Sequence, residues 1–428
     1  GPDNFATGGS LSSFRLRQKR DFVTLRCTTT THRLPPDAPV TKVPVMTAPS
    51  PTVDLSSPRS ALPFWLSLGT VPMAFLGIGL GGYWVLALPL YCWALFSILD
   101  AATGLNEDNP DPATPEDALY LYRLLTVIWF PVQFLVLCFM LWFVPQAGHL
   151  GIMEKVGLFF GMGVMSGTIG INYSHELMHQ KPKIERWLAD LLLATVLYSH
   201  FRTEHLKVHH LYVGTPRDAV TARYNENFHR FFPRVLRESW LSAFRTEKAW
   251  LARKGRPWFH PSNPFWRYWA LQAAMVLIAI ALGGWMGLLF FLIQAYVAVW
   301  QLELTNYVEH YGLTRRYLGE GKYEHALPRH SWNASHRATN WLLINLQRHS
   351  DHHYKPDRRF PLLQTYGTDE APQLPFGYPM MNFMALIPPL WRRRMNPRVR
   401  EWRKQFYPDI TDWTAYNKGL NPMPAGAP

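Results

Sequence analysis

Residues 151–180 read GIMEKVGLFFGMGVMSGTIGINYSHELMHQ. The first part of this stretch, residues 151–173, is apolar and has the length that a helix needs to cross the hydrocarbon core of a bilayer. It continues directly into SHELMHQ, which places His175 and His179 just past the end of the apolar segment. The stretch therefore predicts a membrane-spanning helix that carries two potential metal ligands to one membrane surface.

Five further apolar segments of similar length surround this one in the sequence. A Gly-Gly pair joins the first two segments and another joins the last two, and a short uncharged turn precedes residue 151. Glycine pairs are typical of tight turns between helices. The sequence therefore predicts an all-α fold, a bundle of six transmembrane helices arranged as three hairpins, over residues 61–81, 83–99, 124–145, 151–173, 267–282 and 286–306.

The charges are distributed as in a membrane protein. The formal net charge is +13, but only 17% of residues are charged, and Lys and Arg are absent from residues 61–122, 124–154, 156–180 and 268–314. Such gaps argue against a nucleic-acid-binding module and suit a bilayer, in whose centre charge is costly. Because the basic residues gather in the segments 181–267 and 315–404, the positive-inside rule places these segments on the cytoplasmic side of the inner membrane.

The ends of the chain have a different composition from the apolar part. Residues 1–59 are rich in Pro, Ser, Thr and Arg without apolar periodicity, which predicts a disordered N-terminal tail, and its opening Gly1-Pro2 resembles a protease-cleavage scar. We expect a membrane domain over residues 60–410 and a C-terminal tail or linker over residues 411–428. The three cysteines are far apart and form no CxxC pair, so they predict neither disulfides nor an iron–sulfur domain.

Nine of the 17 histidines fall into four tight groups, which occur in HELMHQ, EHLKVHH, NYVEHYGL and LQRHSDHH. Residues four apart lie on one face of an α-helix, whereas adjacent residues point about 100° apart. The spacing therefore predicts that each of the pairs His175/His179, His205/His209 and His349/His353 converges on one point. His210 and His352, next to a member of a pair, point towards a second. The candidate metal ligands are His175, His179, His205, His209, His210, His310, His349, His352 and His353.

Nine imidazoles are too many for a single zinc ion, which binds three or four protein ligands. They suit two metal ions, divided four and five, with coordination positions left open for oxygen or substrate. Imidazole alone accommodates iron, copper, nickel and zinc, so the histidines do not identify the metal. A histidine-lined metal transporter is the alternative from a different class. It would need ionisable groups along its spans, whereas these histidines gather on one predicted side of the membrane.

Acidic residues stand next to several ligand candidates. Adjacent residues do not share a helix face, so we expect these carboxylates to support the histidines rather than to bind the metal beside them. Each can accept a hydrogen bond from the outer N–H of an imidazole and fix its tautomer. The candidates are Glu309, Glu176, Glu204 and Asp351, with Glu303 in the last turns of the sixth apolar segment as a further one.

The four histidine motifs, in this order, resemble the integral-membrane alkane 1-monooxygenase (alkane hydroxylase) family, within the wider group of membrane fatty-acid desaturases and hydroxylases. The resemblance covers residues 64–402, and the most specific pieces are NYVEHYGL and the run HSWNASHRATNWLLINLQRHSDHH. Two positions depart from the family pattern. Gln180 stands where Lys or Arg is usual and Val208 where Gly is usual, and neither is a ligand position.

The resemblance implies a non-haem centre of two iron ions at the nine histidines. It also implies hydroxylation of the terminal carbon of medium-chain n-alkanes by dioxygen. The electrons would come from rubredoxin, itself reduced by a rubredoxin reductase, and the absence of rubredoxin-type cysteine pairs here means that this donor is a separate chain or a fused domain. The sister alternatives are a xylene-type hydroxylase and a fatty-acyl hydroxylase or desaturase.

An alkane offers no polar group, so its recognition depends on the shape of an apolar channel. We expect this channel between the helices, open to the lipid and ending at the metals. The candidates for its wall are Trp93, Trp129, Phe130, Phe134, Tyr296 and Trp300. Four further histidines, His200, His325, His330 and His336, lack ligand spacing.

Overall fold

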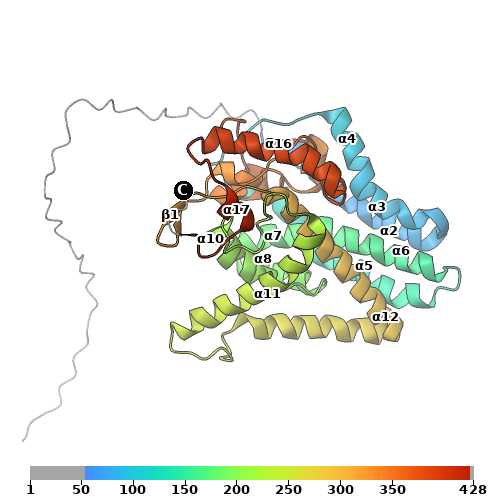
Figure 1. Cartoon of the computed structure of the whole chain (residues 1–428). Coiled ribbons are helices and arrows are strands. Elements are labelled where there is room, and N and C mark those ends of the chain that lie inside the picture. Colours follow the sequence, from blue (N-terminus) through green and yellow to red (C-terminus); the bar gives the residue numbers. More distant parts are fainter. Residues whose placement is uncertain (1–53, 425–428) are drawn as a thin grey trace, which may run out of the picture. The chain divides into compact units, whose positions relative to one another are not determined.

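The structure is a computed structural model that describes residues 54–424, and its regular structure is almost entirely helical (Figure 1). Most of the predicted N-terminal tail, residues 1–53, lies outside the described residues, as do residues 425–428. Within the described part, the first helix begins at Pro58.

Five helices are long and apolar enough to cross a membrane: Pro58–Leu80, Gly82–Thr103, Glu116–Gln146, Ile152–His179 and Pro264–His310. Several combine α-helix with 3-10 or π-helical turns. The first comprises α1 (Pro58–Ala61), η1 (Leu62–Gly69) and α2 (Thr70–Leu80). The second comprises η2 (Gly82–Leu86), α3 (Ala87–Leu90), η3 (Tyr91–Leu95) and α4 (Phe96–Thr103). The third comprises η4 (Glu116–Leu119), α5 (Tyr120–Phe143) and η5 (Val144–Gln146). The others comprise α6 (Ile152–Met165), η6 (Ser166–Ile171) and α7 (Asn172–His179), and α12 (Pro264–His310).

The fifth helix, α12, is 47 residues long but is not continuous. Gly284 has a φ of 61° and a ψ of −153°, a backbone conformation that glycine adopts freely and other residues avoid. The chain reverses there, so α12 forms two arms, residues 264–283 and 285–310 (Figure 1). Gly81 has nearly the same conformation, with a φ of 61° and a ψ of −154°. Both predicted glycine turns therefore exist as turns.

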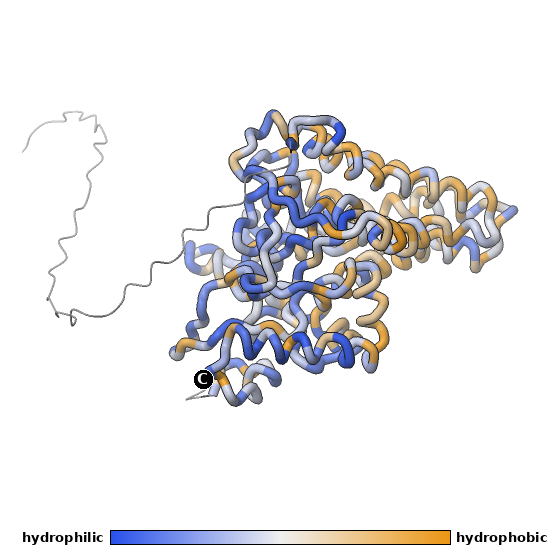
Figure 2. Tube along the Cα trace, turned by 90° about the horizontal axis from the view of Figure 1, so that it is seen from above, coloured by the Kyte–Doolittle hydropathy of each residue, from blue (hydrophilic) through white to orange (hydrophobic). Residues whose placement is uncertain are grey.

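The remaining elements form a polar region that contains most of the charged residues. Figure 2 shows hydrophobic residues concentrated along the helices at one end of the molecule and hydrophilic residues gathered at the other. Before α12 this region contains α8 (Lys183–Ala194), α9 (Phe201–Glu204), η7 (His205–His209), α10 (His210–Tyr212) and α11 (Phe228–Ala252). After α12 it contains β1 (Tyr317–Gly319), β2 (Lys322–Tyr323), η8 (Pro328–His330), α13 (Arg337–Leu342), α14 (His349–Tyr354), η9 (Phe360–Leu362), α15 (Tyr378–Ala385), α16 (Pro388–Phe406) and α17 (Thr414–Lys418).

The two strands, β1 and β2, pair antiparallel as a short hairpin, with Tyr317 opposite Tyr323. At the C-terminal end, α17 lies within the segment expected to be a tail or linker, and its Tyr416 is buried.

Small residues let α6 and η6 approach the second arm of α12 closely. A Cβ atom on Gly163 would lie 2.7 Å from the carbonyl oxygen of Gln294, and one on Gly167 would lie 2.8 Å from that of Ala298. Backbone contact of this kind is a common way for helices to associate within a membrane, where burial of apolar surface adds little. The glycines thereby fix the helix that carries the first histidine motif against the helix that ends in His310.

Buried amide side chains connect the same helices. Gln294 donates to the carbonyl of Thr195 at 2.7 Å, and Gln133 donates to the hydroxyl of Thr195 at 3.0 Å. Gln301 donates to the hydroxyl of Thr168 at 2.6 Å. Burying any of these polar groups in an apolar surrounding without its partner would cost free energy. The hydrogen bonds therefore restrict how the helices can slide or rotate. The helix ends that carry the histidines are held in a defined arrangement.

Candidate metal centre

Five histidines form the first cluster, and their potential ligand atoms all lie within 4.8 Å of one another. They come from three parts of the chain: α7, the η7–α10 segment and α14. The members are His175, His179, His205, His210 and His352. Their Nε2 atoms face a common point. That of His205 lies 2.8 Å from that of His175, 3.1 Å from that of His179 and 2.9 Å from that of His210.

Four histidines form the second cluster, again with potential ligand atoms within 4.8 Å of one another. They are His209, His310, His349 and His353, from η7, the end of α12 and α14. The Nε2 atom of His349 lies 3.1 Å from that of His310 and 3.1 Å from that of His353. The nine predicted histidines are thus brought together in groups of five and four.

The spacing of these nitrogen atoms fits metal coordination. Imidazole ligands about 2.1 Å from one metal ion and at right angles to each other lie about 3.0 Å apart. The separations in both clusters are close to that value, and so many nitrogens cannot all satisfy one another by hydrogen bonds, because each neutral imidazole has one donor and one acceptor. The donor set suits a transition metal.

Burial keeps the histidines in the neutral form that metal binding requires. Burial lowers the pKa of His205, His210 and His352 well below its usual value, and the neighbouring histidines add to the effect. The same causes lower the pKa of His349 and His353. Since a charged imidazole has no free lone pair, these shifts leave the ligand nitrogens available at neutral pH.

A π-helix decides which histidines of the EHLKVHH motif belong together. The sequence spacing predicted that His205 and His209 converge, as they would on an α-helix. Residues 205–209 instead form the π-helical segment η7, and His205 shares its cluster with His210 while His209 belongs to the other. In a π-helix the hydrogen bonds run from residue i to residue i+5, so residues five apart are aligned. The predicted pairs His175/His179 and His349/His353 are each found within one cluster.

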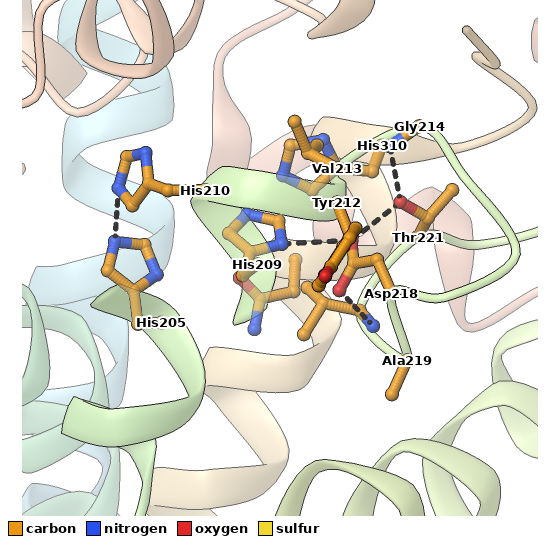
Figure 3. A network of polar contacts seen from close by, with 12 residues as sticks. His205, His209, His210, Tyr212, Val213, Gly214, Asp218, Ala219, Thr221 and His310 are labelled. Atoms are coloured by element: carbon orange, nitrogen blue, oxygen red, sulfur yellow. Dashed lines mark hydrogen bonds and ion pairs between the residues drawn. The ribbon is translucent and has the colours of Figure 1, made fainter. Parts of the chain in front are cut away.

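Asp218 orients His209. The Nδ1 atom of His209 lies 3.0 Å from one carboxylate oxygen of Asp218, and the hydroxyl of Thr221 donates to the same oxygen at 2.7 Å (Figure 3). The backbone N–H of Val220 donates to the other oxygen at 3.1 Å. Although burial raises the pKa of Asp218, His209 and the hydrogen bonds with His209 and Thr221 lower it below its usual value. An ionised Asp218 keeps the proton on Nδ1 and leaves Nε2 of His209 free for a metal.

The sequence did not reveal Asp218. It lies nine residues after His209 in a loop, and no helical spacing relates the two. The only sequence signal was an acidic residue within a short, otherwise uncharged segment between two basic residues, Arg217 and Arg223.

The four predicted carboxylates occupy different surroundings. Glu309 approaches the ligand side of a histidine, because one of its oxygens lies 3.3 Å from Nε2 of His349. Glu176 accepts a hydrogen bond from Gln180 at 3.0 Å. Asp351 accepts from Arg358 at 2.5 Å and from the hydroxyl of Tyr366 at 2.6 Å.

Glu204 is fully buried, and neither of its carboxylate oxygens has a hydrogen-bond partner among residues 54–424. The structure records no contact of Glu176, Glu204 or Asp351 with an imidazole N–H, within the described part of the chain. Their supporting role stays a prediction.

A small cavity of about 50 Å³ lies against both clusters. Its wall includes His175 and His205 of the first cluster and His349 of the second, together with Glu309 and mostly apolar side chains. Of the aromatic residues suggested for a channel wall, Trp93 lines this cavity, where its indole donates to the side chain of Gln301 at 3.2 Å.

The other suggested wall residues lie elsewhere. Trp129 is buried and bonded to Gln133, Phe130 stacks on Phe134, and Tyr296 is exposed.

An apolar groove of about 470 Å³ adjoins this cavity on the surface of the helices. Both are lined by the same four residues, Trp93, Gln301, Pro379 and Asn382. The rest of the groove is formed mainly by hydrophobic side chains of α3, η3, α4, α12, α15 and the residue after α15: Leu90, Ala94, Ile98, Trp300, Leu304, Met380, Phe383 and Leu386. Trp93 and Gln301 therefore separate the groove from the cavity.

Two of the four unassigned histidines have clear positions. His330 is buried, and its ring lies 2.8 Å from the hydroxyl of Tyr407 and 3.3 Å from a carboxylate oxygen of Glu324. His200 is also buried, its ring centre 4.3 Å from that of Tyr198, and its Nε2 atom has no hydrogen-bond partner within the described residues. Burial lowers the pKa of His200 to about 3, so this ring is neutral.

The chain is similar to known membrane oxygenases over most of its length. A family model described as fatty acid desaturase matches residues 150–385. Alkane 1-monooxygenase 2 of Alcanivorax borkumensis is 37% identical over 358 residues, which cover 80% of this chain and 90% of that protein. Alkane 1-monooxygenase 2 of Pseudomonas aeruginosa is 39% identical over 352 residues, which cover 79% and 92%.

Similarity to the xylene/toluene monooxygenase hydroxylase component of Pseudomonas putida is lower, 29% over 255 residues, and covers 59% of this chain. The alkane 1-monooxygenases therefore match more of the chain at higher identity. Together with the two histidine clusters at the ends of apolar helices, this shows that the chain belongs to the alkane 1-monooxygenase family of integral membrane enzymes.

Proposed function

We propose that this protein hydroxylates the terminal methyl group of a medium-chain n-alkane to give a 1-alkanol, using one oxygen atom of O2. The observation that carries the proposal is the apolar cavity whose wall contains ligand-side histidines of both clusters. The relatives named alkane 1-monooxygenase support the choice of an n-alkane over an aromatic or fatty-acyl substrate.

We assign one iron ion to each cluster. The first would be held by His175, His179, His205, His210 and His352, and the second by His209, His310, His349 and His353. The choice of iron rests on the family, since imidazole alone does not select it. When bound, the two irons supply the reduction of O2 and the oxidising power that an unactivated C–H bond demands.

The side chains of the protein prepare the site for this chemistry. The buried, neutral imidazoles present their lone pairs, and Asp218 holds the proton on the outer nitrogen of His209. The mostly apolar cavity wall would align the end of a hydrocarbon chain, whose terminal carbon would lie next to His175, His205 and His349. The carboxylate of Glu309 lies beside the Nε2 atom of His349, the nitrogen that would bind the metal. Glu309 is therefore our candidate for a carboxylate that lies next to the metal.

We propose six membrane crossings, with α12 providing two on either side of Gly284. The membrane domain would cover residues 60–410, flanked by the two tails. The distribution of Lys and Arg favours the cytoplasmic side of the inner membrane for both histidine clusters. Electrons would come from a rubredoxin, separate or fused, which a rubredoxin reductase keeps reduced.

Product analysis tests the proposal. The iron-loaded protein would receive rubredoxin, its reductase, reduced nicotinamide cofactor and a mixture of octane, dodecane, p-xylene and a fatty acyl ester. We expect terminal alkanols, detected by mass spectrometry and lost in His310→Ala. Methylbenzyl alcohol or an unsaturated ester as the main product would reject the n-alkane as substrate. An iron-loaded protein that forms no product would refute the oxygenase itself.

A further inference from the structure

A short chain of buried polar groups lies between a solvent pocket and the substrate cavity. It begins at Ser239 on α11, whose hydroxyl lies 3.1 Å from that of Tyr198. The hydroxyl of Tyr198 donates to a carboxyl oxygen of Glu303 at 2.8 Å. The other carboxyl oxygen of Glu303 accepts from the amide of Asn306 at 3.1 Å. Asn306 in turn lines the cavity, so the chain ends at its wall.

The outer end of this chain is close to water. Ser242, one helical turn beyond Ser239 on α11, lines a polar pocket of about 390 Å³. Its hydroxyl donates to the carbonyl of Ser239 at 3.0 Å. Residues three apart on a helix have Cβ atoms about 5–6 Å apart, so the Cβ atom of Ser239 lies about that far from a residue of the pocket wall.

Glu303 is unusual because it is buried in a membrane-spanning helix without a basic partner. It is 1% exposed, and among residues 54–424 its recorded bonds go to a hydroxyl and an amide only. An ionised carboxylate in such a place is costly, and an ionisable residue inside a span usually has a function. The charged or titratable groups that act on it or lie around it are Tyr198, Glu204, His209 and Asp218.

We infer that Ser239, Tyr198 and Glu303 form a proton relay that delivers protons from the polar pocket to the cavity beside the histidine clusters. The inference rests on the proposed function, which consumes protons: RH + O2 + 2 e⁻ + 2 H⁺ gives ROH + H2O, with the electrons from rubredoxin. All three groups can donate and accept a proton, which a relay requires.

Each passage leaves the relay unchanged. Glu303 releases its carboxyl proton to a water molecule at the cavity wall beside Asn306, whose amide only donates to Glu303, and then takes a proton from the hydroxyl of Tyr198. Tyr198 is restored by Ser239, and Ser239 by water in the pocket. Burial raises the pKa of Tyr198 well above its usual value, so this hydroxyl is protonated at rest and ready to donate.

The first test replaces the carboxyl group. Glu303→Gln keeps the size and a hydrogen-bond acceptor but cannot release a proton, and we expect turnover to fall at least about tenfold, as for loss of a general acid. Iron content and thermal stability should stay at the wild-type level, and Glu303→Asp should recover much of the rate. Wild-type turnover in Glu303→Gln, or no recovery with Asp, would overturn the relay.

The second test interrupts the chain one step earlier. Tyr198→Phe removes the hydroxyl, and we expect a similar fall in turnover and little further loss in the double variant with Glu303→Gln. Tyr122→Phe is the matched control, because Tyr122 is buried and its hydroxyl has no hydrogen-bond partner within residues 54–424. Equal rates for the two phenylalanine variants would reject a role for Tyr198.

The third test needs no turnover and uses the iron-free protein. Infrared spectroscopy follows the C=O stretch of a protonated carboxyl group, assigned to Glu303 by its loss in Glu303→Gln. In heavy water, exchange of this proton should be at least about tenfold slower in Tyr198→Phe than in Tyr122→Phe. A wild-type protein that forms no alkanol but shows this difference would refute the proposed reaction and keep the relay. An unchanged exchange rate would refute the relay alone.

Discussion

The hydrogen bond between His209 and Asp218 determines which nitrogen of that imidazole faces the second cluster. Asp218→Asn removes the charge that stabilises the Nδ1–H form, and loss of such an outer partner typically lowers metal affinity about 10–100-fold. We therefore expect iron to leave the second cluster at lower chelator concentration, with the first cluster retaining its iron. Iron content measured against increasing chelator checks this.

Asp409→Asn is a suitable control for this prediction, since Asp409 is exposed and pairs with Arg316 away from both clusters. Chelator curves that coincide for the two asparagine variants would contradict an orienting role for Asp218.

At the scale of single residues, the sequence predicted the nine histidines that gather in the two clusters but not how they divide between them. Spacing rules for an α-helix correctly paired His175 with His179 and failed for His205, because a π-helical turn moves its partner from His209 to His210. Nothing in EHLKVHH distinguishes a π-helix from an α-helix locally. The contact of Asp218 with His209 could not be predicted for a related reason, because it forms only when the loop that contains Asp218 is folded.

At the scale of elements, close contact between η6 and α12 depends on glycine. A Cβ atom on Gly167 would meet the backbone of Ala298, which cannot move aside as a side chain can. We expect Gly167→Ala to lower the stability by about 1–3 kcal/mol, the usual cost of overpacking. Thermal unfolding in detergent measures the effect as a lower Tm. Gly79→Ala is the matched control, because a Cβ there meets nothing within 4 Å, and its Tm should stay the same or rise. A Tm of Gly167→Ala equal to that of Gly79→Ala would disprove the close contact.

The cavity between the helices gives a second prediction at this scale. Trp93 stands between the cavity and the groove, so Trp93→Ala opens one into the other. We expect the ratio of dodecanol to octanol formed from mixed alkanes to rise about tenfold, the effect of a small change in an apolar pocket. Phe130→Ala, whose ring stacks on Phe134 and does not line the cavity, should leave the ratio unchanged. An unchanged ratio in Trp93→Ala would mean that other residues determine which alkane chain length the enzyme prefers.

The apolar segments and their glycine turns were predictable because hydropathy and glycine act locally. The hydrogen bonds among Gln133, Thr195 and Gln294 were not predictable, because the position of a single polar residue inside an apolar segment does not show which residue it will contact.

At the scale of the whole molecule, the clusters join segments that are distant in the sequence. The ligands come from α7, the η7–α10 segment, the end of α12 and α14. Metal that binds only the folded form stabilises it by about 3–4 kcal/mol at 100 to 1,000 times its Kd. We expect a chelator to lower the Tm of the iron-loaded protein by several degrees and added ferrous iron to restore it. A chelator already saturated with iron is the control, and an unchanged Tm on chelation would show that the metal does not hold these segments together.

The groove beside Trp93 and Gln301 is formed by membrane-spanning helices together with α15, and its exposed side chains, such as Leu90, Ile98 and Phe383, are hydrophobic. An alkane that arrives through it comes from the hydrocarbon phase and never has to be dissolved in water. We therefore expect the enzyme to respond to the mole fraction of alkane in the lipid, not to its amount per volume of buffer. Adding empty vesicles should dilute the substrate even though every solution concentration stays the same.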